Sequence, residues 1–178
     1  VWQSAIKSWR TEYILQSGKM TTWDYHFQKP SQKLNQEQPS QYPIADNQKM
    51  EIYNFPGGYA RKYDEVDKGG GDQPSSLSNV YPDKENTVKI QMQALDSRVK
   101  ITKGYSDCCT LTAGHRFKLN NHPTGALNAQ YVITTVQHEA EQSPDYISSE
   151  PSPIPYEATF SCIPHGAGVP PFRPIRTT

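Results

Sequence analysis

The feature that most constrains the fold is a series of short segments in the second half of the chain whose side chains alternate in character. They are residues 99–103, 115–119, 130–140 and 156–162, separated by turn residues. A period of two is typical of β-strands, because successive side chains point to opposite faces of a sheet. Both faces of residues 130–140 are apolar or β-branched, which indicates a central strand or one in a barrel. This half of the chain is therefore predicted to be mainly β, with several strands.

The first half carries a second alternating segment. Its aromatic positions alternate with the polar residues Thr22, Asp24 and His26; they are Trp23, Tyr25 and Phe27. This pattern predicts a half-buried strand with one aromatic and one polar face. Residues 5–15 are also compatible with a strand, and the turn at 16–19 would join the two as a β-hairpin. Residues 31–48 are expected to form a loop, residues 49–55 a strand, and residues 56–59 a turn.

One helix is predicted, over residues 84–97. Val88, Met92, Leu95 and Val99 are spaced four, three and four residues apart, which places them on one face that should lie on a sheet. Asp83 is the expected N-cap. Residues 66–83 are rich in Gly, Ser and Pro and are expected to form a flexible linker. The expected organisation is therefore a β-hairpin and strand segment (1–65), this linker (66–83), and a helix followed by strands (84–178).

Composition excludes several classes of protein. Lys plus Arg and Asp plus Glu both number 18, so the chain lacks the basic excess typical of nucleic-acid binding. No apolar run approaches the roughly 20 residues of a membrane-spanning helix. The chain begins with Val1 and shows no signal-peptide pattern, so we interpret it as a piece of a longer polypeptide.

Candidate catalytic or metal-binding groups are few. The available metal ligands are Asp107, Cys108, Cys109, His115, His122 and His138. Their spacing is not that of a structural zinc site, which has pairs such as C-x2-C, although His115 and His122 flank a turn and could approach each other. We therefore expect the histidines to be turn and strand residues and predict no metal site and no cofactor.

Nucleophilic catalysis is also not expected. Ser161 lies within a predicted strand, and a Cys108–His115 dyad would need an orienting group and an oxyanion hole. The run 69–71 is Gly-Gly-Gly but lacks the Lys-Ser/Thr of a phosphate loop. We predict that the chain has no catalytic residues and is not an enzyme. Three cysteines do not indicate a disulfide framework, and buried thiols are expected, with a Cys108–Cys162 contact left open.

Several elements resemble, in the same order, those of the VgrG spike proteins of type VI secretion. They are WDYHFQKP (23–30), EIYNFPGGYA (51–60), the helix at 88–97, GYSDCCTLTAGHRFKL (104–119), LNAQYVITTVQHEA (127–140), and FSCIP (160–164) with PFRP (171–174). His26, Tyr105 and Cys109 depart from the common pattern. The resemblance implies a mainly β fold, a β-barrel like that of phage tail hubs, with one amphipathic helix. If the helix is given weight, the fold class is α+β. It places the chain in the later part of the hub module, with residues 1–65 as the end of the first hub barrel and residues 84–178 as the helix and antiparallel β-barrel of the hub.

The resemblance also implies a role. VgrG proteins are trimeric spikes, so a homotrimer that docks on a tube of Hcp-like protein, with effector or tip proteins as further partners, is expected. The spike would assemble in the bacterial cytoplasm and then be injected into a target cell. Neither nucleic-acid binding nor membrane insertion is expected of this part. One alternative is the baseplate hub of a contractile phage or prophage tail; an alternative of another class is a metal-dependent hydrolase.

Overall fold

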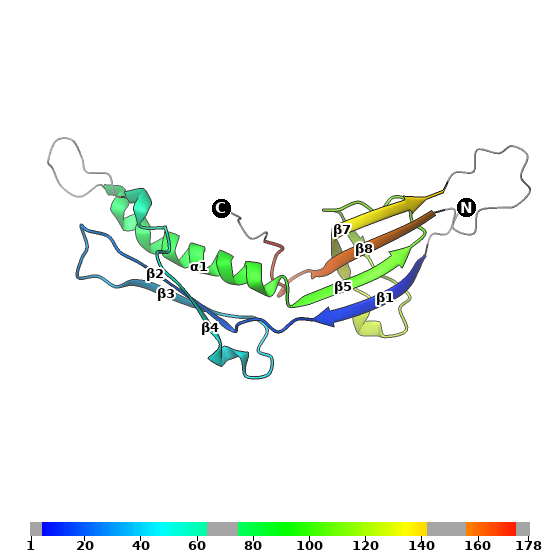
Figure 1. The fold of residues 1–178 in the computed structure, drawn as a ribbon, viewed down its shortest axis with the longest axis horizontal. Coiled ribbons are helices and arrows are strands. Elements are labelled where there is room, and N and C mark those ends of the chain that lie inside the picture. The colour runs from blue at the N-terminus through cyan, green and yellow to red at the C-terminus, as the bar shows by residue number, and fades with distance from the viewer. Residues whose placement is uncertain (1–4, 64–74, 142–155, 174–178) are drawn as a thin grey trace, which may run out of the picture. The chain divides into compact units, whose positions relative to one another are not determined.

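A computed structural model describes residues 5–63, 75–141 and 156–173. Its elements are the strands β1 (Ile6–Tyr13), β2 (Lys19–Asp24), β3 (Leu34–Pro39), β4 (Glu51–Asn54), β5 (Lys100–Ser106), β6 (Arg116–Lys118), β7 (Gln130–Ala140) and β8 (Tyr156–His165), the helix α1 (Val80–Asp96), and the 3-10 helices η1 (Asn47–Lys49), η2 (Arg61–Tyr63), η3 (Ser75–Asn79) and η4 (Gly125–Leu127) (Figure 1). The prediction of a mainly β fold with one amphipathic helix is confirmed. The chain divides into two compact units: unit 1 holds residues 1–14 and 100–169, and unit 2 holds residues 15–99 and 170–178.

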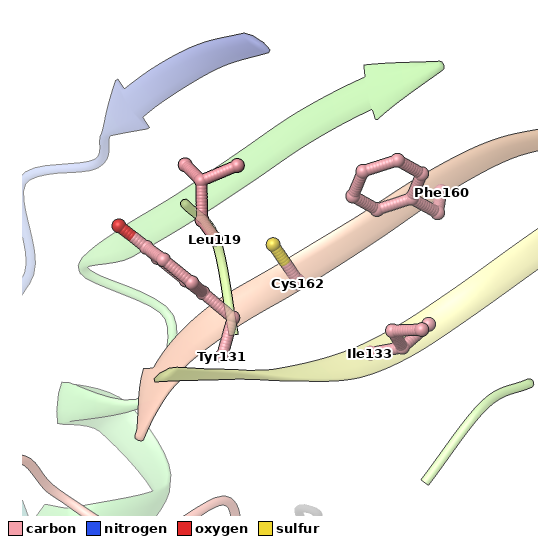
Figure 2. Close-up of a cluster of buried hydrophobic side chains, with 5 residues drawn as sticks. All are labelled: Leu119, Tyr131, Ile133, Phe160 and Cys162. Atoms are coloured by element: carbon pink, nitrogen blue, oxygen red, sulfur yellow. The ribbon is translucent and has the colours of Figure 1, made fainter. Parts of the chain in front are cut away.

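Unit 1 is a single antiparallel sheet with strand order β1-β5-β8-β7-β6. The sheet curls into a half-barrel. Its curvature brings Trp9 on β1 and Phe117 on β6, the two end strands, to a ring-centroid distance of 6.2 Å. The inner face carries the largest core cluster, whose buried members Leu119, Tyr131, Ile133, Phe160 and Cys162 are drawn in Figure 2.

A bulge in β7 changes which of its side chains face the core. Tyr131 and Ile133 lie in the core, but the register with β8 shifts between Ile133 and Thr135. Thr134 donates its hydroxyl to the carbonyl of Ser161, 3.1 Å away. After the extra residue, Val136 rather than Thr135 packs against the core, because a bulge reverses the alternation of faces.

Unit 2 places α1 on a three-stranded sheet of order β3-β2-β4. β2 is antiparallel to β3 and parallel to β4. The predicted helical face is confirmed, since Val88 and Met92 are buried and pack with Met20 of β2. A neighbouring cluster joins Leu34, Tyr59, Ala60 and Val80. Thus Tyr59 and Ala60, at the end of the Pro-Gly-Gly turn, anchor the chain in the core of this unit.

The helix begins earlier than predicted. It starts at Val80, and residues 75–79 before it form η3, so these residues are helical rather than part of a linker. Pro82 does not prevent this start, because the N–H groups of a first helical turn have no partner within the helix. Asp83 is not the N-cap; it accepts hydrogen bonds from Lys62 Nζ at 2.5 Å and Tyr63 Oη at 2.6 Å. The rest of the predicted linker, residues 66–74, lies outside the described residues.

Two strand predictions are wrong. β1 does not form a hairpin with β2; it pairs with β5, where Trp9 lies against the core aromatics of unit 1. The predicted loop at 31–48 contains β3, whose side chains are largely polar but whose backbone pairs with β2 and whose Leu34 is fully buried.

The expected domain grouping also differs from the structure. α1 packs within unit 2 with β2 and β3, which precede it in sequence. Its apolar face meets Met20 and Ile52, so the helix belongs to the core of unit 2.

Candidate assembly surface

An exposed group of aromatic side chains distinguishes unit 2. We call Trp23 on β2, Tyr53 on β4 and Phe55 just after β4, which are 39–58% exposed, the aromatic face; Tyr25 and Phe27, which follow β2 in the chain, are 56% and 47% exposed. Trp23 on β2 and Phe55, just after β4, are in contact, with ring centroids 5.0 Å apart. Large aromatic side chains left in water are enriched at sites where proteins associate.

The strand beneath this face buries its polar side. The aromatic residues of the alternating segment point outward, whereas Thr22, Asp24 and His26 are buried, each at most 6% exposed. On the same side, Met20 packs under α1. The prediction that the segment is half-buried is confirmed, but the polar side lies inside.

Hydrogen bonds explain how a polar face is buried. The Asp24 carboxylate accepts the backbone N–H of Ala60 at 2.9 Å and that of Tyr25 at 3.0 Å. His26 donates through Nε2 to the carbonyl of Tyr63 at 3.0 Å and accepts the N–H of Gln28 at 3.2 Å. Because buried polar groups are tolerated when they are paired, these bonds allow the aromatic residues to remain at the surface.

Charged groups border the aromatic face on β2 and its neighbours. Lys19 Nζ lies 3.5 Å from Glu37 of β3 and 3.5 Å from Glu51 of β4. The Thr21 hydroxyl donates to Glu51, and this bond, together with the Lys19 charge, holds the pKa of the Glu51 carboxyl below its ordinary value. An aromatic centre with a charged border is the common composition of protein interfaces.

The side chains considered as candidate metal ligands do not form a cluster in the described residues. Within residues 5–63, 75–141 and 156–173, no three His, Cys, Asp or Glu side chains form a group that could hold a metal ion. His115 is exposed, and His122 accepts the N–H of Thr124 at 3.0 Å in the loop after β6. His138 Nδ1 is hydrogen-bonded to the hydroxyl of Tyr156. Burial raises the pKa of that hydroxyl.

The other candidates also have structural contacts. Asp107 accepts the N–H of Ala5 at 2.7 Å and pairs with Lys7 at 3.2 Å, contacts that lower the pKa of its carboxyl and join β1 to the end of β5. Ser161 lies within β8, opposite Lys103 and Thr135. The Gly-Gly-Gly run at 69–71 lies outside the described residues.

The cysteines are not bonded to one another. Cys162 is buried, as expected, whereas Cys109 is exposed and Cys108 partly so. The Cys108 thiol lies 3.2 Å from the hydroxyl of Thr110. The expectation of buried thiols is therefore correct for Cys162 only.

The described part of the chain contains no helix with the length and apolar character needed to cross a membrane.

Comparison with known proteins identifies the family. Residues 3–144 match the phage tail baseplate hub (GPD) family. The chain is 23% identical over 172 residues to the type VI secretion system spike protein VgrG1b of Pseudomonas aeruginosa, and 24% identical over 140 residues to VgrG5 of the same organism. These alignments cover 96% and 79% of this chain but only 20% and 15% of those proteins, so the chain spans at most about a fifth of their length.

A solved structure supports the same fold. The 43 kDa tail protein of prophage MuSo2 from Shewanella oneidensis matches with a TM-score of 0.52 over 89% of this chain and 40% of that one, at 7% identity. The resemblance to VgrG spike proteins is thus confirmed, and the chain belongs to the phage tail baseplate hub family.

Proposed function

We propose that this chain forms part of the hub of a contractile injection machine, a trimeric spike of type VI secretion that docks on a tube of Hcp-like protein. The family match and the VgrG relatives support a structural role in a spike or hub. The aromatic face is the observation that supports a role in assembly. Its members Trp23 and Phe55 contact each other and still remain exposed. In this role the chain is a structural part and not an enzyme.

The aromatic face is the surface that packs against a neighbouring copy in the trimer. A buried aromatic side chain removes a large area from water and commonly dominates the energy of an interface. The charged side chains of Lys19, Glu37 and Glu51 then form the polar rim. Effector or tip proteins are further partners of the whole spike, which assembles in the bacterial cytoplasm and is delivered to a target cell.

The test uses the full-length protein that contains this chain. Its mass in solution, measured by light scattering after size-exclusion chromatography, is expected to be that of a trimer. The double variant Trp23→Ser/Phe55→Ser should shift the mass toward the monomer and weaken capture of Hcp-like tube protein. Ile90→Ser is the matched control, since Ile90 is 46% exposed on α1 of the same unit. If the full-length parent protein is a monomer, the proposed trimer is wrong. If the double variant keeps the mass of the parent, the aromatic face is not the trimer interface.

A second candidate is the baseplate hub of a contractile phage or prophage tail. The description of the matching family and the prophage tail protein with a similar fold favour it. Gene order distinguishes the two: capsid and tail genes beside the coding sequence indicate a phage, whereas secretion genes indicate a spike. Both remain structural roles, and stoichiometric zinc bound through His115 or Cys108 in the purified protein would instead favour a metal-dependent hydrolase.

A further inference from the structure

Two adjacent cysteines lie in the loop that joins β5 to β6. Cys109 is exposed and Cys108 is partly exposed, whereas the third cysteine of the chain, Cys162, is buried in the core of unit 1. Adjacent residues have Cα atoms about 3.8 Å apart, so the two thiols are held near each other by the chain itself. Such a pair differs chemically from a lone surface cysteine, because one thiol can resolve a mixed disulfide that forms on the other.

Hydrogen bonds fix the chain on the N-terminal side of this pair. The N–H of Cys108 donates to the Ser106 hydroxyl at 3.1 Å, and that hydroxyl donates to the carbonyl of Ala5 at 2.9 Å. The Asp107 carboxylate accepts the N–H of Ala5 at 2.7 Å. Cys108 is therefore tied to the end of β5 and to the residue before β1. Any movement that brings the two thiols together falls mainly on the peptide group that follows Cys108.

This peptide group faces the side chain of Tyr156, the first residue of β8. The carbonyl of Cys108 accepts a long hydrogen bond, of 3.5 Å, from the Tyr156 hydroxyl. The same hydroxyl is hydrogen-bonded to Nδ1 of His138 on β7. Because a hydroxyl has only one proton, both bonds form together when His138 donates to Tyr156 and Tyr156 donates to Cys108. Hydrogen bonds thus connect β7 and β8 to the peptide between the cysteines.

A disulfide between adjacent cysteines cannot form without a change in this peptide group. The Cα atoms joined by a disulfide are usually roughly 4.4–6.8 Å apart, and the roughly 3.8 Å between neighbouring residues is shorter. Closure therefore requires the backbone between Cys108 and Cys109 to rotate, and the carbonyl that meets Tyr156 must move with it. The hydrogen bond from Tyr156 consequently favours the open, reduced pair, because it depends on the present orientation of the carbonyl.

We propose that Cys108 and Cys109 form a thiol–disulfide exchange site that closes when it meets a low-molecular-weight disulfide, and that Tyr156 opposes this closure. The exposed Cys109 reacts first: its thiolate bonds to one sulfur of the reagent RS–SR, and the other sulfur leaves as RS⁻. The Cys108 thiolate then attacks the Cys109 sulfur and releases the second RS⁻. The pair loses two electrons and two protons, and the reagent is reduced to two RSH.

The surroundings of the Cys108 sulfur suit the second step. The Thr110 hydroxyl lies 3.2 Å from this sulfur and can donate a hydrogen bond to it once it is a thiolate. In the role proposed above, the chain leaves the reducing cytoplasm, so the pair would be open during assembly and able to close after delivery. This timing rests on the proposed function, whereas the exchange chemistry of the pair does not.

The experiment places the full-length protein in defined mixtures of reduced and oxidised glutathione at mildly alkaline pH, where thiolates form. Free thiols are then blocked with iodoacetamide, and the cysteines are mapped by mass spectrometry. In the parent, the peptide with Cys108 and Cys109 should take up no label and carry no glutathione until it is reduced. Cys108→Ser should stop at glutathione bound to Cys109, because no resolving thiol remains. Labelling of the buried Cys162 reports any variant that has unfolded.

Tyr156→Phe tests the role assigned to the hydroxyl. At the same glutathione mixture, this variant should raise the ratio of closed to open pair at least about twofold, as expected when one hydrogen bond that favours the open form is lost. Tyr105→Phe is the matched control, since Tyr105 is 37% exposed on β5 of the same unit, and should keep the ratio of the parent. An unchanged ratio in Tyr156→Phe, with Cys162 unlabelled, would show that Tyr156 does not oppose closure.

Three results in the parent protein would overturn the exchange site. The first is glutathione that stays on Cys109, because the second thiol then fails to resolve it. The second is labelling of both thiols in every glutathione mixture, because the pair then does not react in the full-length protein. The third is a disulfide between two copies of the chain, because Cys109 then behaves as a single surface thiol.

Discussion

Trp9 of β1 lies directly opposite Gly104 of β5, and the missing side chain at Gly104 lets the two strands and the core fit together. A Cβ atom at position 104 would lie 2.6 Å from the backbone oxygen of Ser8 and 2.9 Å from the ring of Phe160. Both distances are shorter than van der Waals contact. This glycine is therefore needed for packing, and β1 could not keep its place beside a larger residue.

Gly104→Ala is expected to destabilise the chain by about 1–3 kcal/mol, because the added methyl group must displace the backbone of β1 or the Phe160 ring. Urea unfolding followed by circular dichroism measures this loss. Gly125→Ala is the matched control: no atom lies within 4 Å of its added Cβ, and its stability should stay near that of the parent. Equal stability of the two variants would contradict the packing described for β1 and β5.

The buried polar side of β2 leads to a second prediction. Asp24→Ala should cost about 1–3 kcal/mol, because the buried N–H of Ala60 loses its acceptor. Trp23→Ala, at the neighbouring exposed position, should cost at most about 1 kcal/mol. Free energies of unfolding from denaturant titrations compare the two. A larger loss of stability in Trp23→Ala than in Asp24→Ala would mean that Trp23, and not Asp24, lies on the buried side of β2.

Thiol labelling tests the burial of Cys162. Burial raises the pKa of its thiol from the ordinary 9.0 to about 12, so little reactive thiolate forms at neutral pH. In folded protein at about pH 8, iodoacetamide should modify Cys109, which is exposed, and spare Cys162. Peptide mapping by mass spectrometry locates the label. Labelling of Cys162 should appear only after denaturant is added.

Alkaline pH should weaken the fold through Tyr59. Burial is the main cause that raises the pKa of this phenol from 10.0 to about 12. Its stabilising effect is complete below pH 10 and is lost as pH rises toward 12, because the unfolded chain releases the proton first. The free energy of unfolding should therefore fall with pH across this window. In Tyr59→Phe this fall should be shallower, although the variant also loses the hydrogen bond from Tyr59 to the carbonyl of Leu34.

Local periodicity in the sequence correctly predicted the elements whose apolar side is the buried side. The spacing of Val88 and Met92 correctly indicated the buried side of α1, and the alternation in β8 correctly indicated the inward Phe160 and Cys162. In both cases the buried side is the more apolar one, so the pattern and the hydrophobic effect agree.

The same reasoning failed where other interactions decided the structure. In β2 the alternation was visible, but Asp24 and His26 form buried hydrogen bonds to residues about 36 positions away, which no local pattern reveals. β3 was missed because its stability comes from backbone pairing with β2 and burial of Leu34 beneath a mostly polar sequence. The alternation therefore showed that the strand is half-buried but not which of its two sides is buried.

The pairing of Tyr13 with Lys100 has a consequence for how this chain could evolve. Residues 15–99, most of unit 2, connect two strands that are direct neighbours, so this segment enters and leaves at points about 5 Å apart. Such an arrangement is a domain inserted at the tip of a β-hairpin. The inserted module could be enlarged, reduced or replaced by a short turn while the β1–β5 ladder stays in register. The same half-barrel could thus be kept in related proteins while the inserted module differs between them.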